Sequence, residues 1–305
     1  MKTQGEKRRC VKFLFSLCCY IWDWLHRQVL RMFGRKPDAS CVILYYHSVP
    51  DKHRSAFAQQ MDVVVRLTQP ISLERVPKLS PGKRYSAITF DDGFENIIDN
   101  AIPELQRREI PATIFLTTGY LGEYADWWPE SSTERRDRIA PAEKWQQLRS
   151  DIISFGSHTV THPYLSTLGE VDARRELLDS RSKLQGLFNR NIITFSFPYG
   201  DYNADLLDWC RDARYERIFT TMPCNAFRNE EEFLSGRVKV EPTDWPLEFR
   251  LKLLGAYRWL PYAIKSKYKI LSRFARAGTG DLSPSTLGRN NSRSNNGNYP
   301  TITVF

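Results

Sequence analysis

The sequence predicts an α/β fold built around a parallel β-sheet. Short apolar runs alternate with longer amphipathic stretches through the middle of the chain, which is the pattern of repeated strand–helix units. Seven candidate strands fall within about 200 residues, which suits a barrel; an open doubly wound sheet is the alternative. In both arrangements the loops after the carboxyl ends of the strands carry the chemistry.

The elements follow one another in a regular order along the chain. The candidate strands are the apolar or β-branched runs at 41–46, 86–90, 112–117, 152–155, 192–197, 217–221 and 237–240. The candidate helices lie between them at 56–67, 96–108, 142–149, 168–188 and 205–213.

Charge is distributed unevenly over the 305 residues, whose formal net charge is +9. Residues 1–37 carry nine Lys/Arg against two Asp/Glu, residues 38–245 carry 25 against 31, and residues 246–277 carry eight against one. The body is therefore acidic and the basic excess lies at its two ends, which argues against a nucleic-acid-binding domain. A composition of 41% hydrophobic and 26% charged residues excludes collagen-like, wholly disordered and polytopic membrane proteins.

These changes in charge and composition along the chain predict four segments. Residues 1–37 form a basic amphipathic helix, 38–245 the main domain, 246–277 further basic amphipathic helices that Pro261 divides, and 278–305 a disordered tail rich in Ser, Asn and Gly.

The first helix has an apolar stripe at steps of three and four residues. The stripe consists of Val11, Leu14, Cys18, Ile21, Leu25, Val29 and Met32. Such a helix can lie in an anionic membrane surface, or it can pack on the protein's own surface. Its ten-residue apolar core is too short to span a bilayer, which takes about 20 residues, and no cleavage site follows it. With six cysteines that form no C-x-x-C pair, we expect reduced thiols and a cytoplasmic protein, peripheral on the inner face of the membrane.

Two motifs at strand ends point to a metal site. Asp91 and Asp92 directly follow an apolar strand, where adjacent carboxylates are costly unless a metal or a catalytic task relieves the cost; a simple Asp-Gly turn is the alternative. His158 and His162 lie four residues apart just after another strand, a spacing suited to a divalent metal. Asp92, His158 and His162 would leave open positions on the metal, and Asp91 would remain as general base.

A third motif, Phe195-Ser196-Phe197-Pro198-Tyr199-Gly200, is another strand that runs into a turn. Backbone N–H groups in such a turn can be aimed at a developing oxyanion. Zinc is the default metal for two imidazoles and one carboxylate, with iron, nickel or cobalt as alternatives.

Taken together, T-F-D-D-G, S-H-T-x-T-H-P and F-x-F-P-Y-G resemble the signature motifs of the polysaccharide deacetylase family, the NodB-homology or carbohydrate esterase 4 group. The resemblance covers roughly residues 40–240 and includes Y-Y-H-S-V on the first strand and W-Q-Q-L before the histidine motif. It implies a distorted (β/α) barrel and metal-dependent hydrolysis of an N-acyl, sometimes O-acyl, group on a sugar.

Carried over by residue, the resemblance makes Asp91 the general base, Asp92, His158 and His162 the metal ligands, and the Tyr199 backbone N–H the oxyanion donor. The sequence departs from the family pattern in two places. Where many members have an arginine that pairs with the base, this chain has Phe197-Pro198, and Arg237 is the candidate replacement. No histidine follows His162, so the role of general acid falls to His47, as in the branch with an early Tyr-His-x-Val strand.

The expected substrate is an N-acetylated glycan or a lipid-linked sugar intermediate, because basic amphipathic flanks suit a substrate held at a membrane. An aromatic insert at 120–129 contains rings that either stack on sugars or belong to the core. A non-catalytic carbohydrate-binding protein on the same fold and an O-acetyl esterase are the alternative functions. No nucleic-acid partner is expected, and the sequence sets no oligomeric state.

Overall fold

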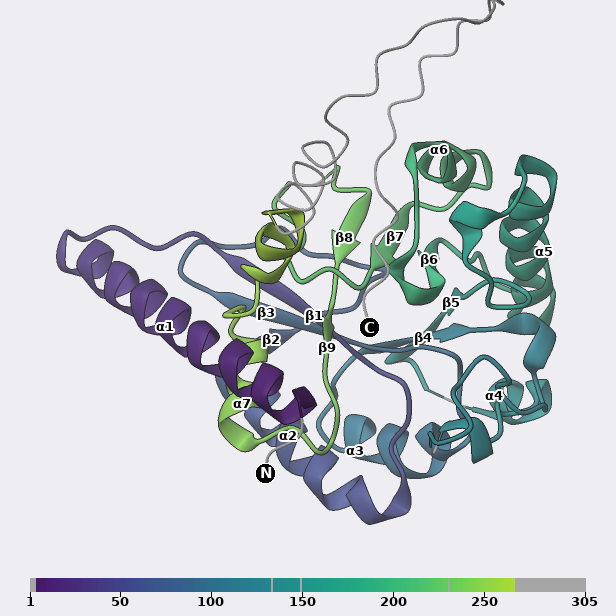
Figure 1. Cartoon of the computed structure of the whole chain (residues 1–305), viewed down its shortest axis with the longest axis horizontal. Helices are drawn as coiled ribbons and strands as arrows, with labels where there is room; N and C mark the ends of the chain where they lie inside the picture. The colour runs from purple at the N-terminus through teal and green to yellow at the C-terminus, as the bar shows by residue number, and fades with distance from the viewer. Residues whose placement is uncertain (1–3, 133, 149, 230, 267–305) are drawn as a thin grey trace, which may run out of the picture.

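The computed structural model describes residues 4–132, 134–148, 150–229 and 231–266 (Figure 1). Within these residues, nine strands form one sheet in which every pair is parallel, in the order β8-β7-β6-β5-β4-β3-β1-β9, with β2 also paired to β3. The strands are β1 (Ser40–Tyr46), β2 (Gln69–Pro70), β3 (Arg84–Phe90), β4 (Ala112–Leu116), β5 (Ile153–Ser157), β6 (Thr194–Ser196), β7 (Arg217–Thr220), β8 (Leu234–Gly236) and β9 (Val238–Lys239). The α/β prediction is therefore confirmed.

The two outer strands of this sheet belong to one continuous segment of chain. Strand β8 pairs with β7 and β9 pairs with β1, and Arg237 alone separates β8 from β9. The Arg237 N–H still donates to the carbonyl of Thr220 at the end of β7, whereas the Val240 N–H donates to that of Tyr45 on β1. The segment thus crosses from one edge of the sheet to the other and closes a distorted barrel, which decides against the open sheet.

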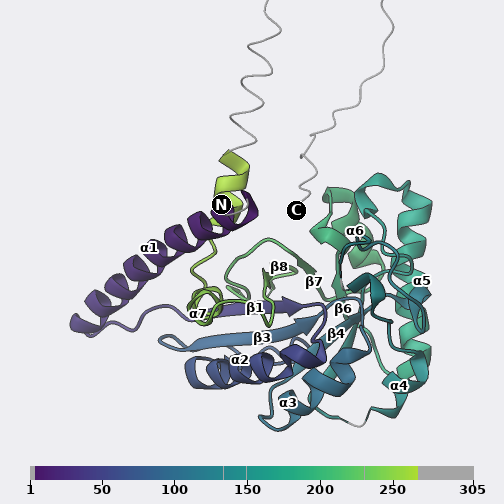
Figure 2. The ribbon, with the colours of Figure 1, turned by 60° about the horizontal axis from the view of Figure 1, so that its bottom comes forward.

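Helices surround this barrel (Figures 1 and 2). They are α1 (Gln4–Met32), α2 (Arg54–Leu67), α3 (Ile102–Gln106), α4 (Ala142–Gln147), α5 (Glu170–Phe188), α6 (Ala204–Asp212) and α7 (Pro246–Leu253), with a π-helical turn at Ile97–Ala101 and 3₁₀ turns at Asp51–His53, Thr118–Tyr120, Glu134–Arg136, Leu165–Thr167 and Pro198–Gly200. The helix predicted at 96–108 is thus in two parts. Pro103 has no N–H to donate to an earlier carbonyl, which suits a change of helical geometry just before it.

The strands are buried on both faces, which explains why they read as continuous apolar runs. Alternate residues of β1 and β3, such as Leu44 and Phe90, pack outward in the cluster that includes Phe57 of α2 and Leu177 of α5. The intervening residues form a second, separate cluster inside the barrel: Cys41, Ile43, Tyr85 and Ala87, with Phe115 and Phe219. This alternation carries on to the strand ends, so His47 and Asp91 continue the inward-facing columns.

The C-terminal part of the described chain packs closely on the barrel. Phe249 and Leu253 of α7 are 1% exposed and belong to the main core. After α7, turns at 254–259 lead to a second helix from residue 260. Two helices were predicted here, and the break between them precedes Pro261, which lies in the first turn of the second helix, where its missing N–H costs nothing. The predicted continuation to residue 277 and the predicted disordered tail lie outside the described residues.

Helix α1 rests against this C-terminal region (Figure 2). Phe13, Leu17 and Tyr20 pack on a small cluster that includes Leu251 and Tyr257. No helix among the described residues has both the length and the apolar character needed to cross a bilayer.

Candidate metal centre

Three side chains meet where the first two motifs leave the sheet. Asp92 lies two residues after β3, and His158 and His162 lie in the loop that directly follows β5. Their ligand atoms all lie within 4.8 Å of one another. The Asp92 Oδ1 is 3.5 Å from the His158 Nε2 and 3.4 Å from the His162 Nε2, and all three residues are buried.

The backbone around these side chains adopts a conformation that L-residues seldom use. Asp92 (φ 69°), Thr159 (φ 69°), His162 (φ 60°) and Tyr199 (φ 59°) all have left-handed backbones. The turn at Asp92 breaks the alternation of the strand, so both Asp91 and Asp92 can reach the barrel mouth. Each such residue costs of order 1–3 kcal/mol, and their gathering at one place is typical of a functional site.

The three residues fit a divalent cation. Asp92 Oδ1 and His162 Nδ1 are buried without a hydrogen-bond partner in the described structure. Burial and the neighbouring charge of Asp91 raise the pKa of Asp92 to about 8, so its ionised form needs a nearby positive charge. Burial also lowers the pKa of His158, and lowers that of His162 well below its ordinary value, which keeps both imidazoles in the neutral form that binds metal.

Neighbouring groups fix the orientation of the candidate ligands. The His158 Nδ1 lies 2.8 Å from the Ser196 carbonyl oxygen; because the carbonyl can only accept, Nδ1 carries the proton and Nε2 is free to bind. The Trp128 indole Nε1–H donates to Asp92 Oδ2 at 3.2 Å, and the Trp127 ring stacks on His162 with centroids 4.3 Å apart. Part of the aromatic insert therefore supports the candidate metal site.

Asp91 is held by an arginine from the closing segment of the barrel. The Arg237 guanidinium donates two parallel hydrogen bonds to Asp91, each 2.7 Å long, and donates to Ser196 Oγ at 2.6 Å and Thr89 Oγ1 at 3.1 Å. Burial alone would raise the pKa of Asp91, but the charge and hydrogen bonds of Arg237 outweigh it and hold that pKa below its ordinary value. The pairing suggested from the sequence for Arg237 is present in the structure, with Arg237 fully buried.

His47 lies at the end of the inward column of β1. Its ring meets Trp128 edge-on at 4.9 Å and Tyr45 at 5.6 Å. Burial, followed by the charge of Lys239, lowers the pKa of His47 to about 3, so the ring is neutral at rest. The nearby carboxylate of Asp91 opposes this lowering of the His47 pKa but does not overcome it.

Tyr199 lies on the turn after β6, beside the candidate ligands. Its ring meets His162 edge-on at 4.7 Å and stacks on Tyr164 at 3.9 Å. The left-handed conformation of Tyr199 turns the backbone at this point. The structure therefore brings all six predicted site residues to the carboxyl ends of β1, β3, β5 and β6.

Two further residues, Ser196 and Trp128, contact the candidate site and were not predicted from the sequence. Ser196 acts through its carbonyl on His158 and through its hydroxyl on Arg237, and Trp128 acts through one indole N–H. The position of Ser196 inside the third motif was the available signal for the first, and the paired tryptophans of the insert were the signal for the second.

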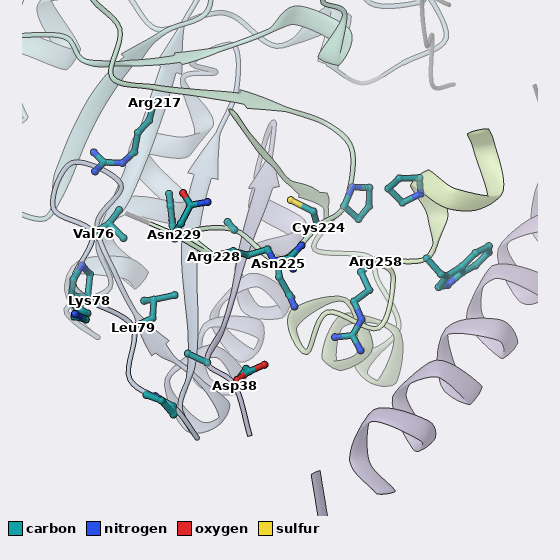
Figure 3. A pocket seen from close by; sticks show the side chains of 18 of the residues that line it. Asp38, Val76, Lys78, Leu79, Arg217, Cys224, Asn225, Arg228, Asn229 and Arg258 are labelled. Atoms are coloured by element: carbon teal, nitrogen blue, oxygen red, sulfur yellow. The ribbon is translucent and has the colours of Figure 1, made fainter. Parts of the chain in front are cut away.

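A separate cavity of about 1310 Å³ lies away from these residues, bordered by the segment just before β1, the segment between β2 and β3, and the loop between β7 and β8 (Figure 3). Its wall includes Arg217, Arg228, Arg258 and Trp259, but none of the six predicted site residues.

Comparison with known proteins agrees with this geometry. A family model described as polysaccharide deacetylase matches residues 78–218. "Putative polysaccharide deacetylase YxkH" of Bacillus subtilis (strain 168) is 28% identical over 215 residues, which cover 67% of this chain and 72% of that protein. Poly-beta-1,6-N-acetyl-D-glucosamine N-deacetylase of Staphylococcus aureus (strain MRSA252) is 27% identical over 166 residues, which cover 52% of this chain and 55% of that protein.

Solved structures share the fold. IcaB from Ammonifex degensii superposes with a TM-score of 0.59 at 21% identity, over 71% of this chain and 99% of that chain. BC0361, a polysaccharide deacetylase from Bacillus cereus, superposes with a TM-score of 0.57 at 20% identity, over 70% of this chain and 69% of that chain. These similarities show that this chain has the same distorted barrel fold as the two solved structures.

Proposed function

Because this chain belongs to the polysaccharide deacetylase family, we propose that it is a metal-dependent hydrolase that removes an N-acyl group, most simply acetyl, from a sugar of a glycan. The observation that carries the proposal is the pairing of a buried Asp-His-His cluster with an ionised, arginine-held carboxylate beside it. A protein that only binds sugar has no need of either feature, so they favour catalysis over a non-catalytic binding role.

Asp92, His158 and His162 would hold the metal, which we propose is zinc. A divalent ion bound there would supply Lewis-acid activation of water and of the acyl carbonyl. Ser196 and Trp128 keep two of these ligands in position through the contacts described above.

The remaining site residues handle protons and charge. Asp91, kept ionised by Arg237, accepts a proton from the attacking water. The Tyr199 backbone N–H donates to the acyl oxygen as negative charge develops on it. Because His47 is neutral at rest, it receives the proton taken from the water and passes it to the departing nitrogen. Water and the neutral amide become an ammonium group and a carboxylate, which accounts for both protons of the water, so the protein gains no net proton.

We propose N-acetylglucosamine polymers or a lipid-linked glycan as the substrate class. The staphylococcal relative is named for a β-1,6-linked N-acetylglucosamine polymer, and this supplies the first probe. A lipid-linked substrate is supported by the exposed apolar face of α1 described in the next subsection.

The test is acetate release by the zinc-loaded full-length protein from β-1,6-linked N-acetylglucosamine oligomers and from a lipid-linked N-acetylated sugar. Asp91→Asn should lower kcat by about 10²–10⁴-fold and keep its metal, because it removes the base alone. His158→Ala should lose both activity and bound zinc, measured by elemental analysis.

Asp208→Asn is the matched control, because Asp208 is an exposed carboxylate on α6 that pairs with Arg211. It should behave as the unmodified protein does. Full activity of Asp91→Asn would refute the assignment of the base, and a protein that takes up no divalent metal would refute the metal-dependent mechanism.

A further inference from the structure

Helix α1 is attached to the rest of the molecule by one flank. Arg9 forms a hydrogen-bonded ion pair with Glu248 on α7, at 2.6 Å, and its guanidinium lies 4.5 Å from the Trp245 ring centroid. Ser16 is fully buried and accepts from the Trp259 indole N–H at 2.9 Å. These contacts fix which side of the helix faces the protein.

The opposite flank is apolar and faces away from the protein. Its members recur at helical spacing along the helix, and each is about half exposed or more: Val11 (65%), Leu14 (59%), Ile21 (47%), Trp22 (74%), Leu25 (47%), Val29 (48%) and Met32 (84%). We call this set the outer face of α1. The sequence alone left open whether the apolar stripe packs on the protein, and the structure shows that it does not. An apolar stripe of this length left in water is typical of an interaction surface.

The exposed charges near the outer face of α1 are basic. Asp23, the one acidic residue between positions 7 and 32, points toward the protein and pairs with Arg27 and Arg258. Exposed basic residues lie at both ends of the helix: Lys7, Arg8 and Lys12 near its start, and Arg31, Arg35 and Lys36 at or just beyond its end.

We propose that the outer face of α1 docks this protein on the surface of a lipid bilayer rich in anionic lipid. The helix has 29 residues and so is about 44 Å long, and it would lie in the plane of the interface with its apolar residues among the acyl chains. Trp22 sits at the depth that indole rings prefer, and the basic residues at both ends contact lipid phosphates. This proposal stands independently of the catalytic assignment.

A second copy of the chain fits this face less well than a bilayer does. Both ends of the helix carry exposed basic residues, so parallel and antiparallel pairing of two α1 helices would each bring like charges together. An anionic surface meets both ends with opposite charge.

The test is co-sedimentation of the full-length protein with vesicles of phosphatidylcholine alone or of an equimolar mixture with phosphatidylglycerol. We expect binding to the anionic vesicles, weaker binding to the neutral ones, and loss of binding at high salt. Trp22→Glu and Leu25→Glu should each lower the bound-to-free ratio by about tenfold or more, because each places a charge in the apolar layer. Val171→Glu is the matched control, since Val171 is 70% exposed on α5, and it should bind as the unmodified protein does.

Acetate release from a soluble oligomer, or the far-UV circular dichroism spectrum, shows that each variant is folded. Failure of the unmodified protein to bind anionic vesicles would overturn the proposal, as would equal binding by Trp22→Glu and Leu25→Glu. A dimer in analytical ultracentrifugation that Leu25→Glu dissociates, without any vesicle binding, would assign the face to a second copy and refute it as well.

Discussion

A chain of direct contacts connects the candidate base to the candidate metal ligands. Arg237 donates to both oxygens of Asp91 and also to the hydroxyl of Ser196, whose carbonyl orients His158. The Arg237 guanidinium is fully buried and also lies 4.7 Å from the Tyr45 ring centroid, a contact that stabilises its charge. Arg237 therefore keeps Asp91 ionised and also holds Ser196, and Ser196 in turn orients His158.

Replacement of Arg237 should test this arrangement. Arg237→Met leaves the buried Asp91 without a partner, so we expect a loss of about 3–5 kcal/mol in the free energy of unfolding and a fall in kcat of about 10²-fold or more. Arg237→Lys keeps the charge but cannot donate two parallel bonds, so it should recover stability better than kcat. Urea denaturation and steady-state kinetics measure the two effects, and unchanged kcat in Arg237→Met would exclude a role in positioning the base.

The candidate ligands could be predicted from the sequence because the end of an apolar run marks the end of a buried strand. Asp91, Asp92 and His158 follow directly after apolar runs, and parallel strands bring their carboxyl ends to one edge. The contacts of Ser196 and Trp128 could not be predicted in this way. They depend on the direction of one carbonyl and one indole N–H, which the three-dimensional path of the loops determines.

Among the elements, the insert between β4 and α4 packs against the candidate metal centre. Its Trp127 and Trp128 cover His162 and Asp92, while Tyr124 on the same insert is 58% exposed. The sequence allowed either a sugar groove or core packing for these rings. The tryptophans contact the candidate ligands, whereas Tyr124 is exposed to solvent.

Trp128→Phe should separate ligand support from packing. The variant keeps an aromatic ring but loses the N–H that bonds Asp92, so zinc affinity should fall by about 10–100-fold. Competition with a zinc chelator measures this. Trp209→Phe on α6, where the ring lies beside Arg174, is the control and should bind zinc with unchanged affinity. Equal zinc affinity in Trp128→Phe would show that the indole hydrogen bond is dispensable.

Other elements show what sequence patterns leave undetermined. The long apolar runs identified β1, β3 and β4, but β2 and β8 have only two and three residues, too few to show a period. The apolar stripe of α1 was evident in the sequence. Periodicity shows that one face of a helix is apolar, but it does not show what that face packs against. In the structure, Arg9, Ser16 and Asp23 find specific partners, and these contacts turn the stripe outward.

At the scale of the whole molecule, the barrel and the C-terminal region form one packed unit. Helix α7 follows the closing segment and buries Phe249 and Leu253 in the main core, while α1 packs beside it. Removal of the region after residue 245 would therefore expose core side chains of the barrel.

Two substitutions on α7 test this unit. Phe249→Ala removes a side chain that is 1% exposed and should lower the free energy of unfolding by about 3–5 kcal/mol. Leu247→Ala, on the same helix but 45% exposed, should change it by about 0.5 kcal/mol or less. Chemical denaturation followed by circular dichroism measures both, and equal losses would indicate that α7 is not anchored through Phe249.

The closing segment also has a consequence for the order in which the protein is made. Asp91 and Arg237 are 146 residues apart, so a growing chain carries its acidic motif and both histidines long before the arginine is synthesised. A nascent chain that ends before β8 lacks both the strands that close the barrel and the arginine that pairs with Asp91. The ribosome therefore synthesises the candidate metal ligands first and Arg237, the partner of the candidate base Asp91, last. The site is complete only after β8 and β9 have closed the barrel.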